Sequence, residues 1–252
     1  MRLAVLSDIH GNRLALDAVL DDLSQRGGAD AVIDLGDRVS GPLWPAEVMD
    51  RLVASAIPGL RGNHDRAVAT DPPSEMIASD RYAWAALTEV RRAALGALPA
   101  TLEPAPGVLA CHGRPGQDDA YLLEEVVEGR LVSSSPAAVA ARLGDVRGAK
   151  LVLCGHSHRA GLLRLSTGVL VVNPGSVGCP AYDDPDPPAH VAEAGTPHAR
   201  YALLDLHDEN PADPVIAFLA VPYDHEAVAR RAEANGRPGW AHALRTGTWP
   251  KG

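Results

Sequence analysis

The sequence predicts an α/β fold that forms one domain over residues 1–252 and contains two β-sheets. Three observations point to it. The first half of the chain alternates short apolar runs with helical patterns, which is typical of βαβα units. The second half consists mostly of short apolar runs, which predict further strands. Hydrophobic residues make up 46% and charged residues 22% of the chain, which are ordinary proportions for a globular protein.

In the first half, short and largely apolar runs predict buried strands, and apolar residues that recur on one helical face predict helices. The apolar residues from Leu16 to Leu23 are spaced i, i+3, i+4, i+7, and Gly27-Gly28 ends that helix. Ser135-Pro136 combines an N-cap residue with Pro at the first helical position. We expect strands at 3–6, 31–35, 57–60, 108–111 and 151–154, and helices at 16–23, 45–55, 82–95 and 135–143.

In the second half, Thr167-Gly168 predicts the turn of a hairpin between strands at 161–165 and 169–172. Two further strands are expected at 201–206 and 215–221, followed by a helix at 225–235 that ends at Gly236. Residues 180–197 are rich in Pro, Asp and Ala and predict a long, mobile, irregular loop. The C-terminal tail from residue 240 shows little periodicity.

The charge balance limits the partners of the protein. Lys plus Arg total 23 and Asp plus Glu total 32, so the net charge is −9. This balance gives no general attraction to duplex DNA or to an anionic membrane, and phosphate binding would need a local positive charge such as a bound metal.

No apolar stretch is long enough to cross a membrane, and Leu3–Leu6 is too short for a signal peptide. Three cysteines without a CxxC pattern indicate a reducing compartment, so we expect a cytoplasmic protein. The scarcity of Lys and the abundance of Ala, Gly and Pro suggest a bacterial origin.

Five histidines share one context, because each lies just beyond a predicted strand beside Gly, Asp or Asn. Loops at the carboxyl ends of strands are where α/β sheets form their sites. Imidazole with carboxylate suits Mn, Fe, Zn or Co better than Ca or Mg. The set offers more ligands than one ion needs and about enough for two. The segments are Ser7-Asp8-Ile9-His10, Leu35-Gly36-Asp37, Gly62-Asn63-His64-Asp65, Cys111-His112-Gly113 and Gly155-His156-Ser157-His158.

Other reactive or aromatic residues have simpler interpretations. Arg38 and Arg66 flank the metal motifs, where they would either grip a phosphate or lie on the surface. For the remaining residues ordinary packing or solvation is the favoured interpretation, although the three aromatic ones would also suit the mouth of a substrate site. They are Trp44, Tyr121, Tyr182, Cys111, Cys154, Asp118-Asp119, Asp183-Asp184, His190, His198, His207, His225 and His242.

Taken in order, these motifs resemble those of the calcineurin-like metallophosphoesterase superfamily. The motifs are D-x-H, G-D, G-N-H-D, a lone His after a strand, and G-H-x-H, and their order and spacing agree over residues 3 to 158. Asn173-Pro174-Gly175-Ser176 extends the likeness to small bacterial phosphodiesterase-type members. The resemblance implies two mixed β-sheets packed face to face with helices outside, a four-layer αββα sandwich.

The resemblance also implies a role for each site residue. One metal ion would be held by Asp8, His10 and His158, and a second ion by Asn63, His112 and His156. Asp37 would bridge the two ions, and a hydroxide between them would attack phosphorus. His64 would not bind metal but would protonate the leaving oxygen or stabilise the charge that develops there. Asn63, Arg38 and Arg66 would contact the substrate. The cofactors would be two divalent ions, with Mn²⁺ expected first and Fe, Zn, Co or Ni as alternatives.

The chain departs from the pattern of the protein phosphatases in this superfamily, which carry G-D-x-x-D-R-G and G-N-H-E. Ser40 stands where the second acid of the first motif would support the catalytic histidine, and Asp65 ends the second motif. This departure argues against a phosphoprotein phosphatase and leaves open what orients His64, for which Asp65 is one option.

The function predicted from these residues is hydrolysis of small phosphodiesters or phosphomonoesters. One alternative is a non-catalytic metal-binding scaffold of the same fold, since a retromer subunit shares the fold without the catalytic residues. A nuclease is the lesser alternative because the chain is short and acidic. The expected partner is a small phosphate ester, with no duplex nucleic acid and no membrane, and a homo-oligomer stays open. Specificity is expected in the loops at 41–45, 113–123 and 180–197.

Overall fold

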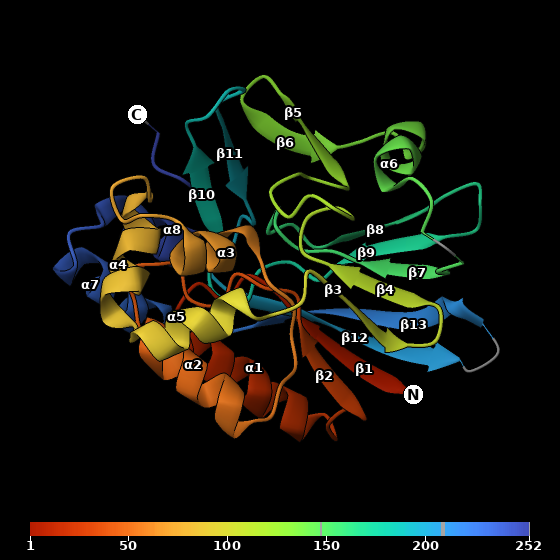
Figure 1. Cartoon of the computed structure of the whole chain (residues 1–252), viewed down its shortest axis with the longest axis horizontal. Coiled ribbons are helices and arrows are strands. Elements are labelled where there is room, and N and C mark those ends of the chain that lie inside the picture. The colour runs from red at the N-terminus through yellow and green to blue at the C-terminus, as the bar shows by residue number, and fades with distance from the viewer. Residues whose placement is uncertain (147, 208–209, 252) are drawn as a thin grey trace.

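Two β-sheets pack face to face at the centre of this computed structural model, which describes residues 1–146, 148–207 and 210–251 (Figure 1). The first sheet has the strand order β13-β12-β1-β2, in which β1 and β2 are parallel and the other pairs are antiparallel. Its strands are β1 (Arg2–Leu6), β2 (Ala31–Asp34), β12 (Ala199–His207) and β13 (Asn210–Val221).

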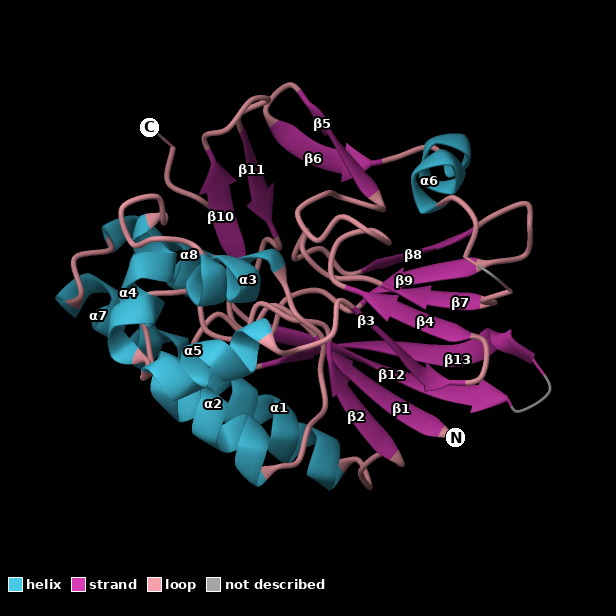
Figure 2. Ribbon diagram, viewed as in Figure 1, coloured by secondary structure: helices cyan, strands magenta, loops and turns pink. Residues whose placement is uncertain are grey.

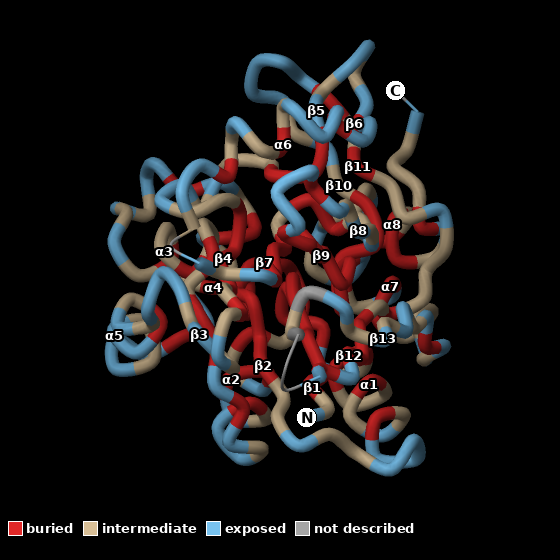
Figure 3. The backbone as a smooth tube through the Cα atoms, turned by 90° about the vertical axis from the view of Figure 1, so that its right-hand side faces the viewer, coloured by how far each residue is buried: buried red, intermediate tan, exposed pale blue. Residues whose placement is uncertain are grey.

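The second sheet is also mixed, with the order β3-β4-β7-β9-β8 and parallel pairing of β4, β7 and β9. Leu3 and Val5 of β1 pack against Leu151 and Leu153 of β7, so one apolar layer joins the two sheets. Figure 3 shows the buried residues concentrated along the central strands. The strands of the second sheet are β3 (Thr101–Ala105), β4 (Val108–Cys111), β7 (Leu151–Leu153), β8 (Gly161–Arg164) and β9 (Leu170–Asn173).

Helices cover the outer faces of both sheets (Figure 2). On the first sheet, α1 (Arg13–Gln25) and α2 (Pro45–Ala54) bury Leu16 and Leu52 against Leu6. On the second, α6 (Pro136–Leu143) buries Val139 against Val152. The expected four-layer αββα arrangement is therefore confirmed.

Five more helices lie beside the sandwich in the described residues. Val39 and Met49 join three of them in one apolar cluster, and Leu43 joins the other two in a second cluster. These helices are α3 (Asn63–Thr70), α4 (Ala78–Ala86), α5 (Glu89–Gly96), α7 (His225–Ala234) and α8 (Pro238–Thr246). The helix expected at 82–95 is two helices, since Thr88 caps α5 by accepting a hydrogen bond from the backbone N–H of Arg91.

A third, small sheet was not predicted. It has the order β10-β11-β6-β5 and lies near one end of the sandwich (Figure 1). Its strands are β5 (Glu124–Val127), β6 (Arg130–Ser133), β10 (Ala181–Asp184) and β11 (His190–Glu193). The expectation of an irregular segment at 180–197 is thus wrong for β10 and β11, which are short strands that pair with each other, while β11 also pairs with β6, which is distant in the sequence.

Two other local expectations also differ from the structure. The tail expected from residue 240 begins inside α8. The strand expected at 57–60 is reduced to a single bridge between Asp34 and Gly59. Across the described ranges, every helix is too short or too polar to span a membrane.

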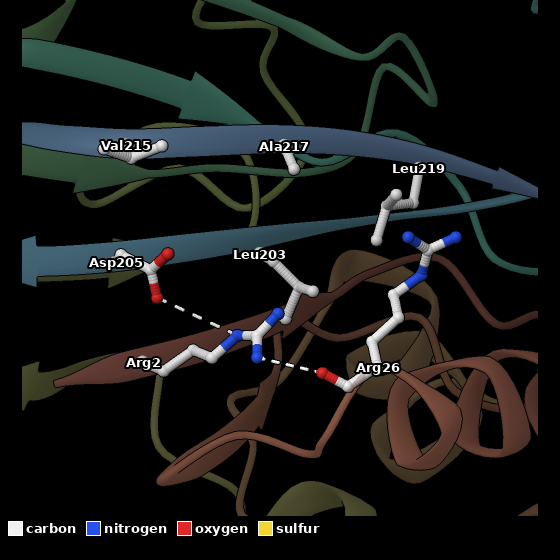
Figure 4. Close-up of a pocket in the computed structure, with 7 residues that line it drawn as sticks. All are labelled: Arg2, Arg26, Leu203, Asp205, Val215, Ala217 and Leu219. Atoms are coloured by element: carbon white, nitrogen blue, oxygen red, sulfur yellow. Dashed lines mark hydrogen bonds and ion pairs between the residues drawn. The ribbon is translucent and has the colours of Figure 1, made fainter.

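A hollow of about 320 Å³ lies over β12 and β13 (Figure 4). In it, Arg2 Nε lies 3.8 Å from Asp205 Oδ1 and Arg2 Nη1 donates to the carbonyl of Arg26. None of the residues predicted for the functional site lines this hollow.

Candidate metal centre

The predicted ligands follow the carboxyl ends of four strands, two in each central sheet. Asp8 and His10 come after β1, Asp37 after β2, and His112 directly after β4. His156 and His158 come after β7. The loops of the first sheet are tied together, because the backbone N–H groups of Asp8 and His10 donate to the carbonyls of Gly36 and Asp37 at 3.0 and 2.9 Å.

These side chains gather into two groups, each able to offer three ligand atoms within 4.8 Å of one another. One group is Asp8, His10 and His158, and the other is Asp37, His112 and His156. All of them are buried except His156, which is half-buried. The first group is the trio that the resemblance implies for one ion, whereas the second contains His112 and His156 of the other implied trio together with Asp37, the expected bridge.

The ligand atoms of the first group face one another at short range, an arrangement that suits a cation. His10 Nδ1 donates to the carbonyl of Ser40 at 2.7 Å, and His158 Nδ1 donates to that of Cys179 at 2.8 Å. The Nε2 atoms of the two rings then face each other only 3.1 Å apart, and His158 Nε2 also lies 3.3 Å from Asp8 Oδ1. Burial acts to lower the pKa of His158, but Asp8 outweighs it and raises the pKa well above its ordinary value. In addition, Asp8 Oδ1 is buried without a hydrogen-bond partner.

The second group repeats this pattern. His112 Nδ1 donates to the carbonyl of Leu35 at 2.7 Å, which leaves Nε2 facing the amide oxygen of Asn63 and Asp37 Oδ2 at 3.1 Å each. Asn63 is the first residue of α3, and it brings a seventh donor to the centre. The residues present therefore fit two divalent cations with mixed nitrogen and oxygen ligands.

Electrostatics agree with this fit. Burial raises the pKa of Asp8, but nearby imidazoles outweigh it and lower the pKa to about 2. Burial lowers the pKa of His10 to about 4 and that of His156 to about 3, so both rings are neutral at pH 7. Burial also acts to lower the pKa of His112, but Asp37 outweighs it and raises the pKa to about 10. Without a cation, a proton on His112 therefore balances the carboxylates.

The backbone at the centre is unusual. Only seven non-glycine residues in the described ranges have positive φ, and five of them are predicted ligands. Such left-handed conformations are uncommon outside glycine, cost roughly 1–3 kcal/mol each, and concentrate at functional sites. The five are Asp8, His10, Asp37, His156 and His158, with φ between 50 and 68°.

His64 lies beside the ligands in the first turn of α3. Its ring centroid is 5.6 Å from that of His10, and its backbone N–H donates to Asp37 Oδ1 at 3.0 Å. Its Nδ1 donates to Asp80 Oδ1 of α4 at 2.9 Å. Burial acts to lower the pKa of His64, but Asp37 and Asp80 outweigh it and raise the pKa to about 9.

The acid that contacts the His64 ring is Asp80 and not Asp65, the option that the sequence suggested. Asp65 does not orient His64, because its carboxylate accepts from the backbone N–H groups of Asp37, Arg38 and Gly62. Sequence reasoning missed Asp80, which is 3% exposed. An acid in the first turn of a helix is commonplace, so no signal in the sequence distinguishes Asp80.

The two predicted substrate-binding arginines have carboxylate partners. Arg38 is 8% exposed, and its Nε donates to the buried Asp34 at 2.6 Å, so its side chain lies mostly in the interior, and its contact with substrate stays a prediction. Arg66 is more open, and two of its nitrogens donate to Asp118 at 2.8 Å each.

Aromatic rings pack directly on the ligand imidazoles. Tyr121 stacks on His156 with centroids 4.8 Å apart, and Tyr182 meets His158 edge-on at 4.6 Å. The two tyrosine hydroxyls lie 2.8 Å apart. Tyr182 belongs to β10, so the small third sheet helps to hold the ligands of the second central sheet.

Comparison with known proteins adds the family context. A model of the calcineurin-like phosphoesterase superfamily domain matches residues 1–208. An uncharacterized protein of Methanocaldococcus jannaschii is 26% identical over 264 residues, covering 94% of each chain.

Two solved structures share the fold. A metallophosphoesterase from Sphaerobacter thermophilus is 22% identical with a TM-score of 0.70, covering 98% of this chain and 99% of its own. A hypothetical protein from Pyrococcus horikoshii is 23% identical with a TM-score of 0.76, covering 99% of each chain.

Proposed function

The chain belongs to the calcineurin-like phosphoesterase superfamily, and on this basis we propose that it is a dinuclear metal-dependent enzyme that hydrolyses small phosphodiesters or phosphomonoesters. The observation that carries the proposal is the pair of buried ligand groups whose donor atoms face one another. Two bound divalent ions would polarise the phosphoryl group and supply a nucleophile from water at neutral pH.

The proposed ligand roles follow the two groups, with Asn63 added to the second group and Asp37 shared between the two ions. Asp8, His10 and His158 would hold one ion, and Asn63, His112 and His156 the other. Asp37 suits the bridging position, because its Oδ2 lies 3.1 Å from His112 Nε2 and 3.9 Å from His10 Nε2. The mixed imidazole and carboxylate donors favour Mn²⁺, with Fe, Zn, Co or Ni as alternatives.

The remaining residues act on the substrate. His64 would protonate the leaving oxygen through Nε2, since Nδ1 is engaged by Asp80. Asn63 lies at the same edge of the centre and would contact the phosphoryl group as well as the ion. Arg66 lies one helical turn after Asn63. Its guanidinium would release Asp118 and donate two hydrogen bonds to a phosphate group of the substrate.

A small substrate follows from the charge. At a net charge of −9 the protein repels a long polyanion, whereas a single phosphate group is attracted locally by bound cations. We therefore expect hydrolysis of aryl phosphodiesters or phosphomonoesters with little cleavage of duplex DNA.

The test combines metal analysis with a substrate panel at low salt. We expect about two metal ions per chain, loss of aryl phosphodiester hydrolysis with a chelator, and recovery with Mn²⁺. The Asp37→Ala variant should lose both metal and activity. A protein that binds no metal would contradict the proposal, one that binds metal but hydrolyses no ester would be the scaffold, and efficient cleavage of duplex DNA would make it a nuclease.

A further inference from the structure

We propose that Asp80 is the positioning residue of His64, and that it replaces the acid that is absent at Ser40. This inference rests on the proposed function, because it concerns the group that protonates the leaving oxygen. Asp80 lies in the first turn of α4, outside every motif that the sequence brings to the metal centre.

The contacts of Asp80 carry the inference. Its Oδ1 accepts from His64 Nδ1 at 2.9 Å and from the hydroxyl of Ser40 at 2.5 Å. The carboxylate is buried, so solvent does not compete for these two donors. A hydrogen bond to Nδ1 fixes the tautomer and the rotation of the ring, and it leaves Nε2 free for the leaving group.

Ser40 connects this pair to the metal ligands. Its backbone carbonyl accepts from His10 Nδ1 at 2.7 Å, while its side chain donates to Asp80. Ser40 therefore fixes both the orientation of the His10 ring and the position of the Asp80 carboxylate that orients His64. A serine at this position does not leave His64 without support, since its hydroxyl holds a carboxylate supplied by another helix.

Neighbouring acids have other partners. Asp65 is occupied by backbone N–H groups, and Asp37 reaches His64 through the backbone N–H rather than through the ring. The position of α4 is itself fixed, because Ala83 packs with Val39 next to Ser40 in one apolar cluster. Asp80 is thus held rigidly at the distance that orienting the ring requires.

The kinetic test is a double-mutant cycle with His64→Ala, Asp80→Asn and the combined variant. Asp80→Asn should lower kcat by roughly 10–100-fold for esters with poor leaving groups, less for good leaving groups, and never by more than His64→Ala. In the His64→Ala background it should cause no further loss, because the two residues act as one unit. Ser79→Ala is the matched control, as Ser79 is a buried neighbour on the same helix, and it should keep wild-type kinetics. An equal loss from Asp80→Asn with and without His64 would overturn the inference.

A second readout does not depend on activity. In zinc-loaded protein, the ring Nδ1–H resonance of His64 should be visible by NMR, be absent in His64→Ala, and be shifted or lost in Asp80→Asn but kept in Ser79→Ala. Asp80→Glu should restore part of the signal and of kcat. An unchanged resonance in Asp80→Asn would overturn the positioning role. Absence of hydrolysis by the wild type together with the expected NMR changes would instead overturn only the proposed function.

Discussion

Strained backbone at the centre is held in part by hydrogen bonds to a buried side-chain carboxylate. Asp37 has a φ of 57°, and Asp65 accepts from its N–H at 2.8 Å. Asp65 also accepts from Arg38 and Gly62, so one carboxylate joins the G-D loop to the start of α3. The conformational cost of the ligand loops is thus offset by buried hydrogen bonds that have no direct part in metal binding.

A second buried acid, Glu124, predicts a measurable dependence of stability on pH. Burial raises the pKa of Glu124 to about 7 from 4.5, and this effect outweighs the hydrogen bond from Ser157. A raised pKa in the folded state gives stability that is complete below pH 4.5 and is lost as the pH rises to 7. Glu124→Gln removes this loss, so it should stabilise the protein above pH 7 by about 2–3 kcal/mol and have little effect near pH 4.5.

The measurement is urea unfolding of wild type and Glu124→Gln at several pH values. Glu125→Gln is the matched control, because the neighbouring Glu125 is exposed on the same strand, and it should leave the pH profile unchanged. A constant difference between wild type and Glu124→Gln across this pH range would show that Glu124 does not titrate as described.

At the residue scale the sequence is informative only where the chemistry leaves a local pattern. Each predicted ligand follows an expected strand within a few residues of a glycine, aspartate or asparagine, and the structure brings those donors together. Asp80 lies in an ordinary helical stretch and becomes relevant only through the packing of α4 on Val39. Arg38 lies inside a motif, yet its side chain turns to Asp34, which spacing alone does not reveal.

Among the elements, the central strands and their covering helices could be predicted because burial makes them continuously apolar or periodic. The third sheet could not, since β10 and β11 have four residues each and β11 pairs with β6 at a single position, Val191 with Arg130. Helix α8 was missed because it begins with Pro238-Gly239, a pair typical of turns.

The contact between the loop after β2 and the start of α3 gives a prediction at the element scale. A Cβ at Gly62 would collide with Asp37 Oδ1 and lie 2.5 Å from the Asp37 backbone nitrogen. The φ of Gly62 is −82°, which alanine tolerates, so alanine is excluded here only because there is no space for its Cβ. Gly62→Ala should displace Asp37 and weaken metal binding by roughly 10–100-fold, the usual effect of disturbing the support of a ligand.

Titration of Mn²⁺ into the chelator-treated variant measures this affinity. Gly161→Ala is the control, because a Cβ at Gly161 meets nothing within 4 Å, and it should bind metal as the wild type does. Wild-type affinity in Gly62→Ala would mean that Asp37 is not the bridging ligand.

On the scale of the whole molecule, the candidate centre joins the two central sheets at one edge. Asp8, His10 and Asp37 come from the first sheet, and His112, His156 and His158 from the second. The apolar layer between the sheets holds them elsewhere, but at this edge the contacts are between buried imidazoles and carboxylates, such as His112 with Asp37 at 3.1 Å and His158 with Asp8 at 3.3 Å. Cations bound there would act as a cross-link between the sheets, and their binding free energy would add to the stability of the fold.

Metal removal should therefore lower the melting temperature as well as activity. A ligand present at 100 times its Kd stabilises the folded state by about 2.7 kcal/mol, and each 1 kcal/mol shifts the Tm of a chain of this size by roughly 2–4 °C. We expect the Tm to fall by about 5–11 °C with a chelator and to recover with Mn²⁺. The Asp37→Ala variant should melt at the same temperature with and without chelator, because it lacks the bridge that binding needs. If chelation strips the metal from the wild type without changing its Tm, the ions do not link the sheets, and the apolar layer alone holds the strand ends in register.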